Sequence, residues 1–237
     1  MVVGTVVAVV FVFWYPQLYF KVVGAADVLR ILIGVDLVLG PLLTLILFKP
    51  GKRGLKFDIS MVVAVQLVAL VYGVHTLYQE RPYYTVFVKD RFEILALRDI
   101  DQSKISDPAL HSKPWSQPIY VVATMPVDMW EQQRVLEETV FEGKPDIHQR
   151  PEYWSPYVEK AEVVSKGARS LSQLLERRPD MQDEINKVMR RSERSGELAY
   201  VPIMGRHRVF SLVLDTRTWM PVDVIDIDPW EKPPGGV

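Results

Sequence analysis

The sequence predicts an integral membrane protein in which two to three N-terminal transmembrane helices are followed by one α+β domain. Two apolar runs, 26–48 and 59–79, each reach the roughly 20 residues that a helix needs to cross a bilayer core about 30 Å thick. From residue 80 onward, short apolar runs alternate with polar loops, as in a domain that contains both strands and helices. We therefore divide the chain into a transmembrane region, 1–79, and an α+β domain, 80–237.

Composition excludes several classes of function. The 237 residues carry 28 basic and 29 acidic side chains. Residues 1–80 hold 6 basic and 4 acidic side chains, a net charge of +2, and residues 81–237 hold 22 and 25, a net charge of −3. A balance so close to zero gives no electrostatic basis for binding nucleic acid. The chain has no cysteine, which excludes a disulfide scaffold, a thiolate nucleophile and a cysteine-based metal site.

The run 59–79 is the more apolar of the two long runs. It contains no charged residue, and its main polar side chains are Gln66 and His75. A helix at the surface of a soluble protein would show a polar face on every turn. Because only the short loop 49–58 separates this run from 26–48, we expect the two to form a membrane hairpin.

The first fifteen residues form a third apolar run that ends at Pro16. The run lacks the basic start and the small-residue cleavage site of a signal peptide. As a helix it would be about 22 Å long, which is short for a complete span. We expect a third spanning helix, 1–15, whose N-terminal end is missing, with Trp14 and Tyr15 as interfacial anchors. The alternative is a short helix that enters the bilayer only partway.

The hairpin loop predicts the orientation of the whole chain. It carries Lys49, Lys52, Arg53 and Lys56 within eight residues. Short loops rich in lysine and arginine remain in the cytoplasm. Residues 16–25 and everything after the second hairpin helix then face outward. In a Gram-negative cell this orientation makes the C-terminal part a periplasmic α+β domain of an inner-membrane protein.

The domain is expected to combine strands with helices. Asp128 and Glu131 have the spacing of a capping box, which predicts a helix that continues to Phe141. Pro179 favours the start of another helix. The expected elements are strands 83–88, 92–97, 119–124, 198–204, 208–214 and 220–227, helices 128–141, 158–177 and 179–188, loops 98–117 and 143–157, and a disordered tail 233–237.

Polar residues inside the first hairpin helix are candidate binding residues. An acid at the position of Asp36 costs roughly 2.5–3.5 kcal/mol in the bilayer, so it should face protein or water. It is either a proton relay or partner contact, or a packing group that bonds to Gln66. Asp27 and Arg30 lie on one face and either contact a partner or pair with each other.

Small residues in the same helix suggest a second kind of contact. Pro41 should kink the helix. Gly34 and Gly40 allow a second helix to approach closely. The helix that packs there belongs either to a partner or to this chain itself.

No pattern in the sequence predicts catalysis. The four histidines, His75, His111, His148 and His207, lack metal-ligand spacing, and no phosphate loop or nucleophile motif is present. The acids Asp223, Asp226 and Asp228 either bind a cation weakly or lie solvated on a strand and turn. We expect no enzymatic activity, no cofactor and no metal.

The chain resembles the TfpX/TfpZ family of type IV pilin accessory proteins along essentially its whole length. The most specific segment is Gly34-Val-Asp-Leu-Val-Leu-Gly-Pro-Leu-Leu-Thr44, an unusual string for a membrane helix. The other matching segments are Tyr15-Pro16, Tyr19-Phe20, Leu29–Leu45, Phe48–Lys52, Leu55–Asp58, Tyr78–Pro82, Asp90–Phe92 and Asp226–Trp230. The chain lacks the polar, basic stretch with which family members usually begin.

The resemblance implies a pilus biogenesis factor, a pilin-specific chaperone or assembly helper in the inner membrane. A pilin waits there as one apolar helix that carries a buried glutamate, with its globular head in the periplasm. We expect the face formed by Asp27, Arg30 and Asp36, with the notch at Gly40 and Pro41, to contact that helix. Arg30 is the expected partner of the pilin glutamate.

Two other functions remain open from the sequence. The first is a membrane enzyme that modifies pilin, with Asp36 or the acids between Asp223 and Asp228 as the catalytic groups. The second is a sensory or transport subunit that uses Asp36 as a proton site.

Overall fold

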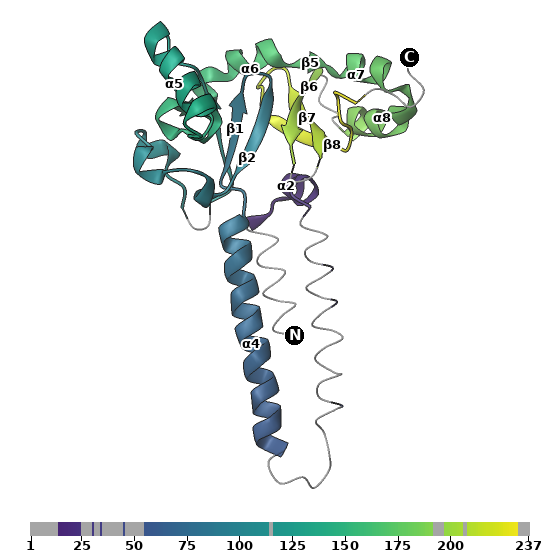
Figure 1. Cartoon of the computed structure of the whole chain (residues 1–237). Helices are drawn as coiled ribbons and strands as arrows, with labels where there is room; N and C mark the ends of the chain where they lie inside the picture. The colour runs from purple at the N-terminus through teal and green to yellow at the C-terminus, as the bar shows by residue number, and fades with distance from the viewer. Residues whose placement is uncertain are drawn as a thin grey trace. The chain divides into compact units, whose positions relative to one another are not determined.

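The computed structural model divides the chain into two compact units, Met1–Arg81 and Pro82–Val237, which we call unit 1 and unit 2 (Figure 1). The residues that the structure describes are 14–24, 30, 34, 45, 55–113, 116–191, 197–205 and 208–231.

Unit 1 is described mainly through helix α4, Leu55–Glu80, and the short helix α2, Gln17–Val22. Helix α4 has 26 residues and is therefore about 39 Å long. In the described part of the chain one helical stretch, Ser60–Glu80, is long and apolar enough to cross a membrane, with a mean hydropathy of 1.8.

The structure agrees with the second predicted hairpin helix and corrects its start. The predicted helix 59–79 lies within α4, but residues 55–58, which we expected in the loop, are already helical. No proline or glycine lies between Leu55 and Asp58 to stop the helix. In the predicted helix 26–48, the described positions Arg30, Gly34 and Leu45 are helical. Residues 1–13 of the predicted helix 1–15 lie outside the described residues.

Unit 2 is built on one mixed sheet. Its eight described strands are β1 (Tyr84–Val88), β2 (Arg91–Leu95), β3 (Ile119–Ala123), β4 (Trp154–Pro156), β5 (Arg169–Ser170), β6 (Leu198–Met204), β7 (Val209–Asp215) and β8 (Pro221–Ile225). The strand order is β4-β3-β1-β2-β6-β7-β8, and β5 pairs with β6. The pairs β1–β3 and β2–β6 are parallel, and the others are antiparallel.

Two pairs of consecutive strands form antiparallel hairpins. Strands β1 and β2 pair from Val88↔Arg91 to Tyr84↔Leu95, and Lys89 takes a positive φ of 56° in the tight turn between them. Positive φ is typical of the short turns that suit the twist of a hairpin. The turn between β7 and β8 spans residues 216–218, and the pairing register shifts between Val213 and Leu214.

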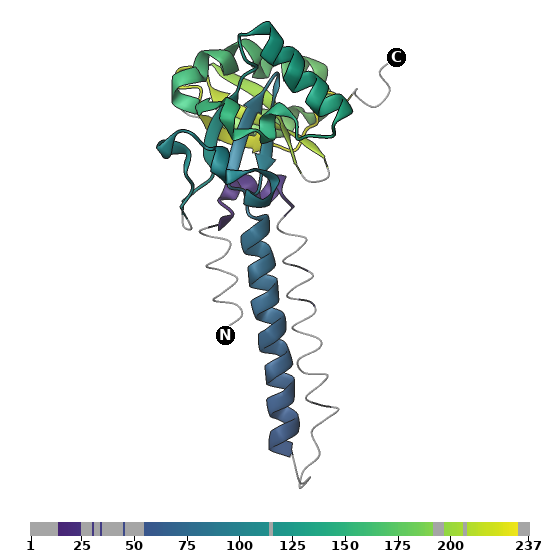
Figure 2. The same cartoon turned by 60° about the vertical axis from the view of Figure 1, so that its left-hand side comes forward.

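The α-helices of unit 2 are α5 (Met129–Phe141), α6 (Ala161–Gly167), α7 (Leu171–Arg177) and α8 (Gln182–Arg191). Short 3₁₀ helices lie at Leu97–Asp99, Gln102–Lys104, Pro108–Leu110, Ile147–Gln149, Pro151–Tyr153, Tyr157–Lys160 and Pro179–Met181. Figure 1 shows α5 toward one end of the sheet and α7 and α8 toward the other, and Figure 2 shows helices covering the strands.

Asp128 caps helix α5 as predicted, because its Oδ1 accepts a hydrogen bond of 2.9 Å from the backbone N–H of Glu131. The single helix predicted at 158–177 is wrong. The chain leaves helix α6 after Gly167. Arg169 and Ser170 then pair with β6 as strand β5, and α7 begins at Leu171. The side chain of Ser170 caps this new start by accepting a bond from the N–H of Ser172.

Two predicted loops also contain more structure than we expected. The loop at 98–117 holds 3₁₀ turns. The loop at 143–157 holds further 3₁₀ turns and strand β4, whose residue Ser155 pairs with Val122. Three-residue elements of this kind are too short to leave a periodic pattern in the sequence. The predicted disordered tail lies outside the described residues.

One hydrophobic cluster of unit 2 joins α7 and α8 to the sheet. Four helical residues pack against four residues of the sheet and its C-terminal extension: Leu171, Leu174, Ile185 and Val188 against Tyr200, Val213, Ile225 and Ile227. The helical members repeat at spacings of three, which is typical of one buried helix face.

Replacing Gly167 by valine is expected to destabilise unit 2 by about 1–3 kcal/mol, the usual cost of overpacking a filled site. A Cβ at this position would lie 3.1 Å from the ring of Phe87, which is buried in β1, and 3.6 Å from the carbonyl oxygen of Lys89. Thermal unfolding of the purified chain measures the change. Gly167→Ala is the graded control and should lose less stability than Gly167→Val. Equal melting temperatures for the native protein and both variants would contradict the prediction.

Candidate functional site: apolar partner-binding surfaces

Most of the predicted binding residues lie outside the described residues. These are Asp27, Asp36, Gly40 and Pro41, and, in the basic loop, Lys49, Lys52 and Arg53. Arg30 is helical and exposed, and Lys56 lies in α4. A Cβ added at Gly34 would meet no described atom within 4 Å.

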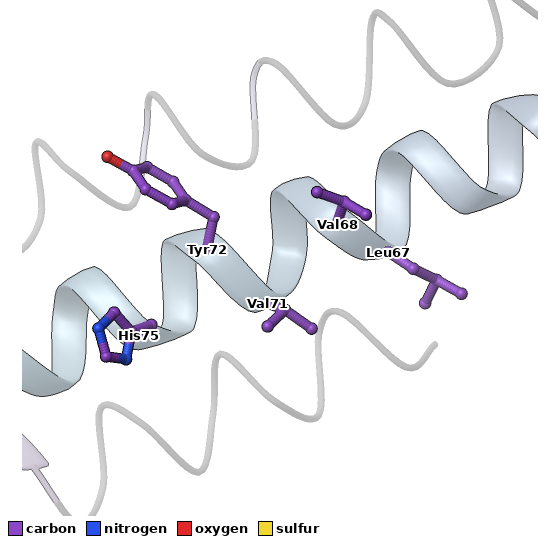
Figure 3. Close-up of a pocket in the computed structure, with 5 residues that line it drawn as sticks. All are labelled: Leu67, Val68, Val71, Tyr72 and His75. Atoms are coloured by element: carbon purple, nitrogen blue, oxygen red, sulfur yellow. The ribbon is translucent and has the colours of Figure 1, made fainter.

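Helix α4 presents an open apolar groove. Figure 3 shows the side chains that line it, Leu67, Val68, Val71, Tyr72 and His75. These positions share one helix face because spacings of three and four bring side chains together. The groove has a volume of about 450 Å³, and Val68, Val71 and Tyr72 are each about 70% exposed. A surface of this kind is stable against lipid or against another apolar helix.

An aromatic cluster lies at the C-terminal end of α4. The rings of Trp14 and Tyr78 meet edge to face at 5.1 Å, and the hydroxyl of Tyr15 donates a bond of 3.1 Å to the carbonyl oxygen of Leu77. The guanidinium of Arg81 lies 5.0 Å from the centre of the Tyr78 ring. Aromatic rings beside a cation are typical of residues at a membrane–water boundary.

A second apolar surface lies on helix α5. We use "α5 face" for six exposed apolar side chains, Val127, Met129, Trp130, Leu136, Val140 and Phe141. In α5 itself Val135 is the buried residue, so the helix contacts its own domain through a narrow stripe. Large apolar side chains gathered in this way on one exposed helix, and at Val127 just before it, mark a candidate interaction site.

Arg150 holds α5 against the following segment. Its guanidinium is buried and donates to the carboxylate of Glu138 at 2.7 Å, to the hydroxyl of Thr139 at 3.3 Å and to the carbonyl oxygen of Pro145 at 2.7 Å. Hydrogen bonds from Arg150 and Lys144 hold the pKa of Glu138 below its usual range. These contacts fix the helix that carries the α5 face.

Arg150 also lines a pocket of charged side chains, and the charges of this pocket neutralise one another. It has a volume of about 430 Å³ and contains both basic and acidic side chains. Its cations already pair with acids of the same region: Lys104 with Glu152, Arg98 with Asp99, Arg134 with Glu131, and Lys144 with Glu138. We therefore assign it no ligand.

The acids considered as catalytic groups have local structural contacts. Asp226 pairs with Arg208 at 2.8 Å, and Asp223 and Asp228 accept bonds from the backbone N–H groups of Val224 and Trp230. Within the described ranges, no cluster of three histidine, aspartate or glutamate side chains is placed to hold a metal ion. The arrangement of these acids is that of strand and turn residues.

The sequence analysis did not identify the α5 face. The helix and its cap were predicted, but the apolar residues of an amphipathic helix are normally assigned to the core. Only the structure shows that most of them point into solvent. The one available signal was the doubled apolar pairs at the two ends, Met129-Trp130 and Val140-Phe141, because a single core-facing stripe does not need neighbouring residues.

Known proteins place the chain in a family. It is 29% identical over 229 residues to the fimbrial assembly protein of serogroup I of Dichelobacter nodosus, an alignment that covers 94% of this chain and 88% of that protein. The serogroup E1 protein of the same organism matches with the same identity and coverage. The protein of serogroups C1 and C2 is 40% identical over 94 residues, which are 38% of this chain and 71% of that protein.

No family model matches the chain, and no solved structure matches it. The relatives nevertheless agree in name, and two of them align along nearly the whole sequence. The chain therefore belongs to the family of fimbrial assembly proteins.

Proposed function

We propose that the protein is an inner-membrane accessory factor of type IV fimbrial biogenesis, of the TfpX/TfpZ type, that binds a specific fimbrial subunit and assists its assembly without catalysing a reaction. The observation that carries this proposal is the similarity to fimbrial assembly proteins over 94% of the chain. Helix α4, long and apolar enough to cross a bilayer, supports the membrane location. The four basic residues between 49 and 56 favour a periplasmic unit 2.

The proposed contact has two levels, because a fimbrial subunit before assembly has an apolar membrane helix and a periplasmic head. The apolar groove on α4 suits a helix whose side chains are also apolar. Arg30 then selects the subunit through its intramembrane glutamate, since a buried carboxylate needs a charged or hydrogen-bonding partner. Asp27 and Asp36 belong to the same proposed contact face. Unit 2 contacts the head.

Co-purification tests this proposal. The tagged, detergent-solubilised protein is purified from cells that express its own fimbrial subunit, and in parallel from cells that express the subunit of another strain. We expect enrichment of the cognate subunit alone, by at least tenfold over the other. Failure to recover either subunit, even after crosslinking in the cells, would refute direct binding.

A charge reversal then tests the proposed contact at Arg30. Arg30→Glu places a like charge opposite the subunit glutamate and should reduce co-purification at least tenfold, because like charges in an apolar setting repel strongly. Lys21→Glu is the matched control, since Lys21 is an exposed basic residue of α2 in the same unit. Equal recovery with both variants would remove Arg30 from the contact while leaving the function in place.

A further inference from the structure

The α5 face is too large to be incidental. Trp130 and Phe141 are 80% and 82% exposed. An aromatic side chain carries about 150–250 Å², so these two alone expose roughly 300 Å². The four aliphatic members, of which Val127 and Met129 are the most exposed, roughly double this area. The summed exposed area of these side chains thus approaches the roughly 800 Å² that one partner contributes to a standard interface.

The face is complementary to itself. Helical geometry sorts it into two rows, with Met129, Leu136 and Val140 in one and Trp130 and Phe141 in the other. Gln133 and Glu137 lie between the rows, and Gln133 Nε2 donates to Glu137 Oε1 at 2.8 Å.

An antiparallel copy of α5, related by a two-fold axis near the level of residue 135, pairs like with like. It brings Met129 against Val140, Trp130 against Phe141, and Leu136 against Leu136 of the second copy, and it places Gln133 opposite Glu137. With a helical rise of 1.5 Å per residue, the two members of each pair lie within roughly 2 Å of the same level along the helix axis. A parallel arrangement would instead place Glu137 opposite Glu137.

We propose that the α5 face binds a second copy of this chain, so that the protein is a two-fold symmetric dimer joined by antiparallel α5 helices. A two-fold interface uses the same patch on both subunits, and that patch must therefore be complementary to itself. The charge of the helix disfavours a lipid surface as the occupant. Helix α5 carries three glutamates and one arginine, whereas helices that lie on membranes are rich in lysine and arginine.

Oligomeric state tests the inference. The full chain, purified in detergent, is measured by light scattering coupled to size exclusion over a hundredfold range of concentration. We expect the mass of two chains for the native protein. The double variant Trp130→Asp with Phe141→Asp should raise the dissociation constant at least tenfold, because large aromatic side chains dominate interface energetics. Val158→Asp is the matched control, since Val158 is equally exposed outside α5.

Circular dichroism verifies that the double variant is folded, as expected for substitutions at exposed positions. The inference is overturned if the native chain has the mass of one chain at every concentration, or if the double variant keeps the native dissociation constant. It is also overturned if the double variant keeps its mass but no longer recovers the fimbrial subunit, since the face would then belong to that partner.

Disulfide crosslinking tests the register. The chain has no cysteine of its own, so single cysteines report without background. Two differently tagged copies, one with Gln133→Cys and the other with Glu137→Cys, are expressed together and treated with a mild oxidant. The mixed dimer should form at least threefold more than either single variant crosslinks with itself. Equal or greater crosslinking of Gln133→Cys alone would refute the antiparallel arrangement.

Discussion

Arg150→Ala is expected to destabilise unit 2 by about 2–3 kcal/mol and to release helix α5 from the segment that follows it. The substitution removes hydrogen bonds to three groups, and about 1 kcal/mol is typical of each. It also leaves the carbonyl oxygen of Pro145 without this donor. The expected loss of stability is smaller than for breaking a fully buried ion pair, because the carboxylate of Glu138 retains some contact with water. Urea or thermal unfolding of the full chain measures the loss.

The effect of Arg150→Ala should depend on pH. The pKa of Glu138 is lowered in the folded state, so the stability that its carboxylate contributes is present above the ordinary glutamate pKa of about 4.3 and is lost as the pH falls through the folded value. The difference between native and variant proteins should therefore be largest near neutral pH and should narrow below pH 4.

Arg134→Ala is the control for this prediction. Arg134 also pairs with a glutamate of α5, Glu131, at 3.3 Å, but its side chain is largely exposed. An exposed pair of this kind contributes little to stability, because water and salt screen it. If the two substitutions cost the same, Arg150 does not hold the helix as the geometry indicates.

Local elements of the fold were predictable because each depends on residues close together in the chain. The cap at Asp128 and the β1–β2 hairpin are set by spacing and turn residues. The parallel pairing of β1 with β3 is different, because Tyr84 pairs with Ile119 across a sequence separation of 35 residues. Alternating apolar residues mark a strand but do not identify its neighbour. The break after Gly167 is likewise followed by pairing of Arg169 and Ser170 with β6, which is distant in sequence.

The candidate site was predictable to the extent that it depends on hydropathy. The apolar length of α4 follows from composition, and so does the presence of a helix at 128–141. Which side of α5 remains exposed depends on where Arg150 and Tyr153 attach it. These residues lie in a segment that the sequence analysis assigned to a loop. A pattern of apolar residues therefore predicts that a surface is apolar, but not whether it faces the core or a partner.

The double variant Val68→Asp with Val71→Asp is expected to prevent α4 from crossing the membrane. Each aspartate at the centre of a spanning helix costs about 2.5–3.5 kcal/mol on insertion scales, so the pair costs about 5–7 kcal/mol. Both positions lie near the middle of Ser60–Glu80 and are exposed, so the substitutions create no cavity in unit 1. Unit 2, which follows α4, should then remain on the cytoplasmic side.

A reporter fused to the C-terminus measures this change of side. Alkaline phosphatase is active only after export, so the native fusion should be active. At equal abundance, the double aspartate fusion should be at least tenfold less active than the native fusion. Val68→Leu with Val71→Leu is the matched control and should keep full activity, because it changes the shape of the groove but not its polarity. An inactive native fusion would contradict the periplasmic location of unit 2. An active double aspartate fusion would show that export of unit 2 does not depend on the apolar centre of α4.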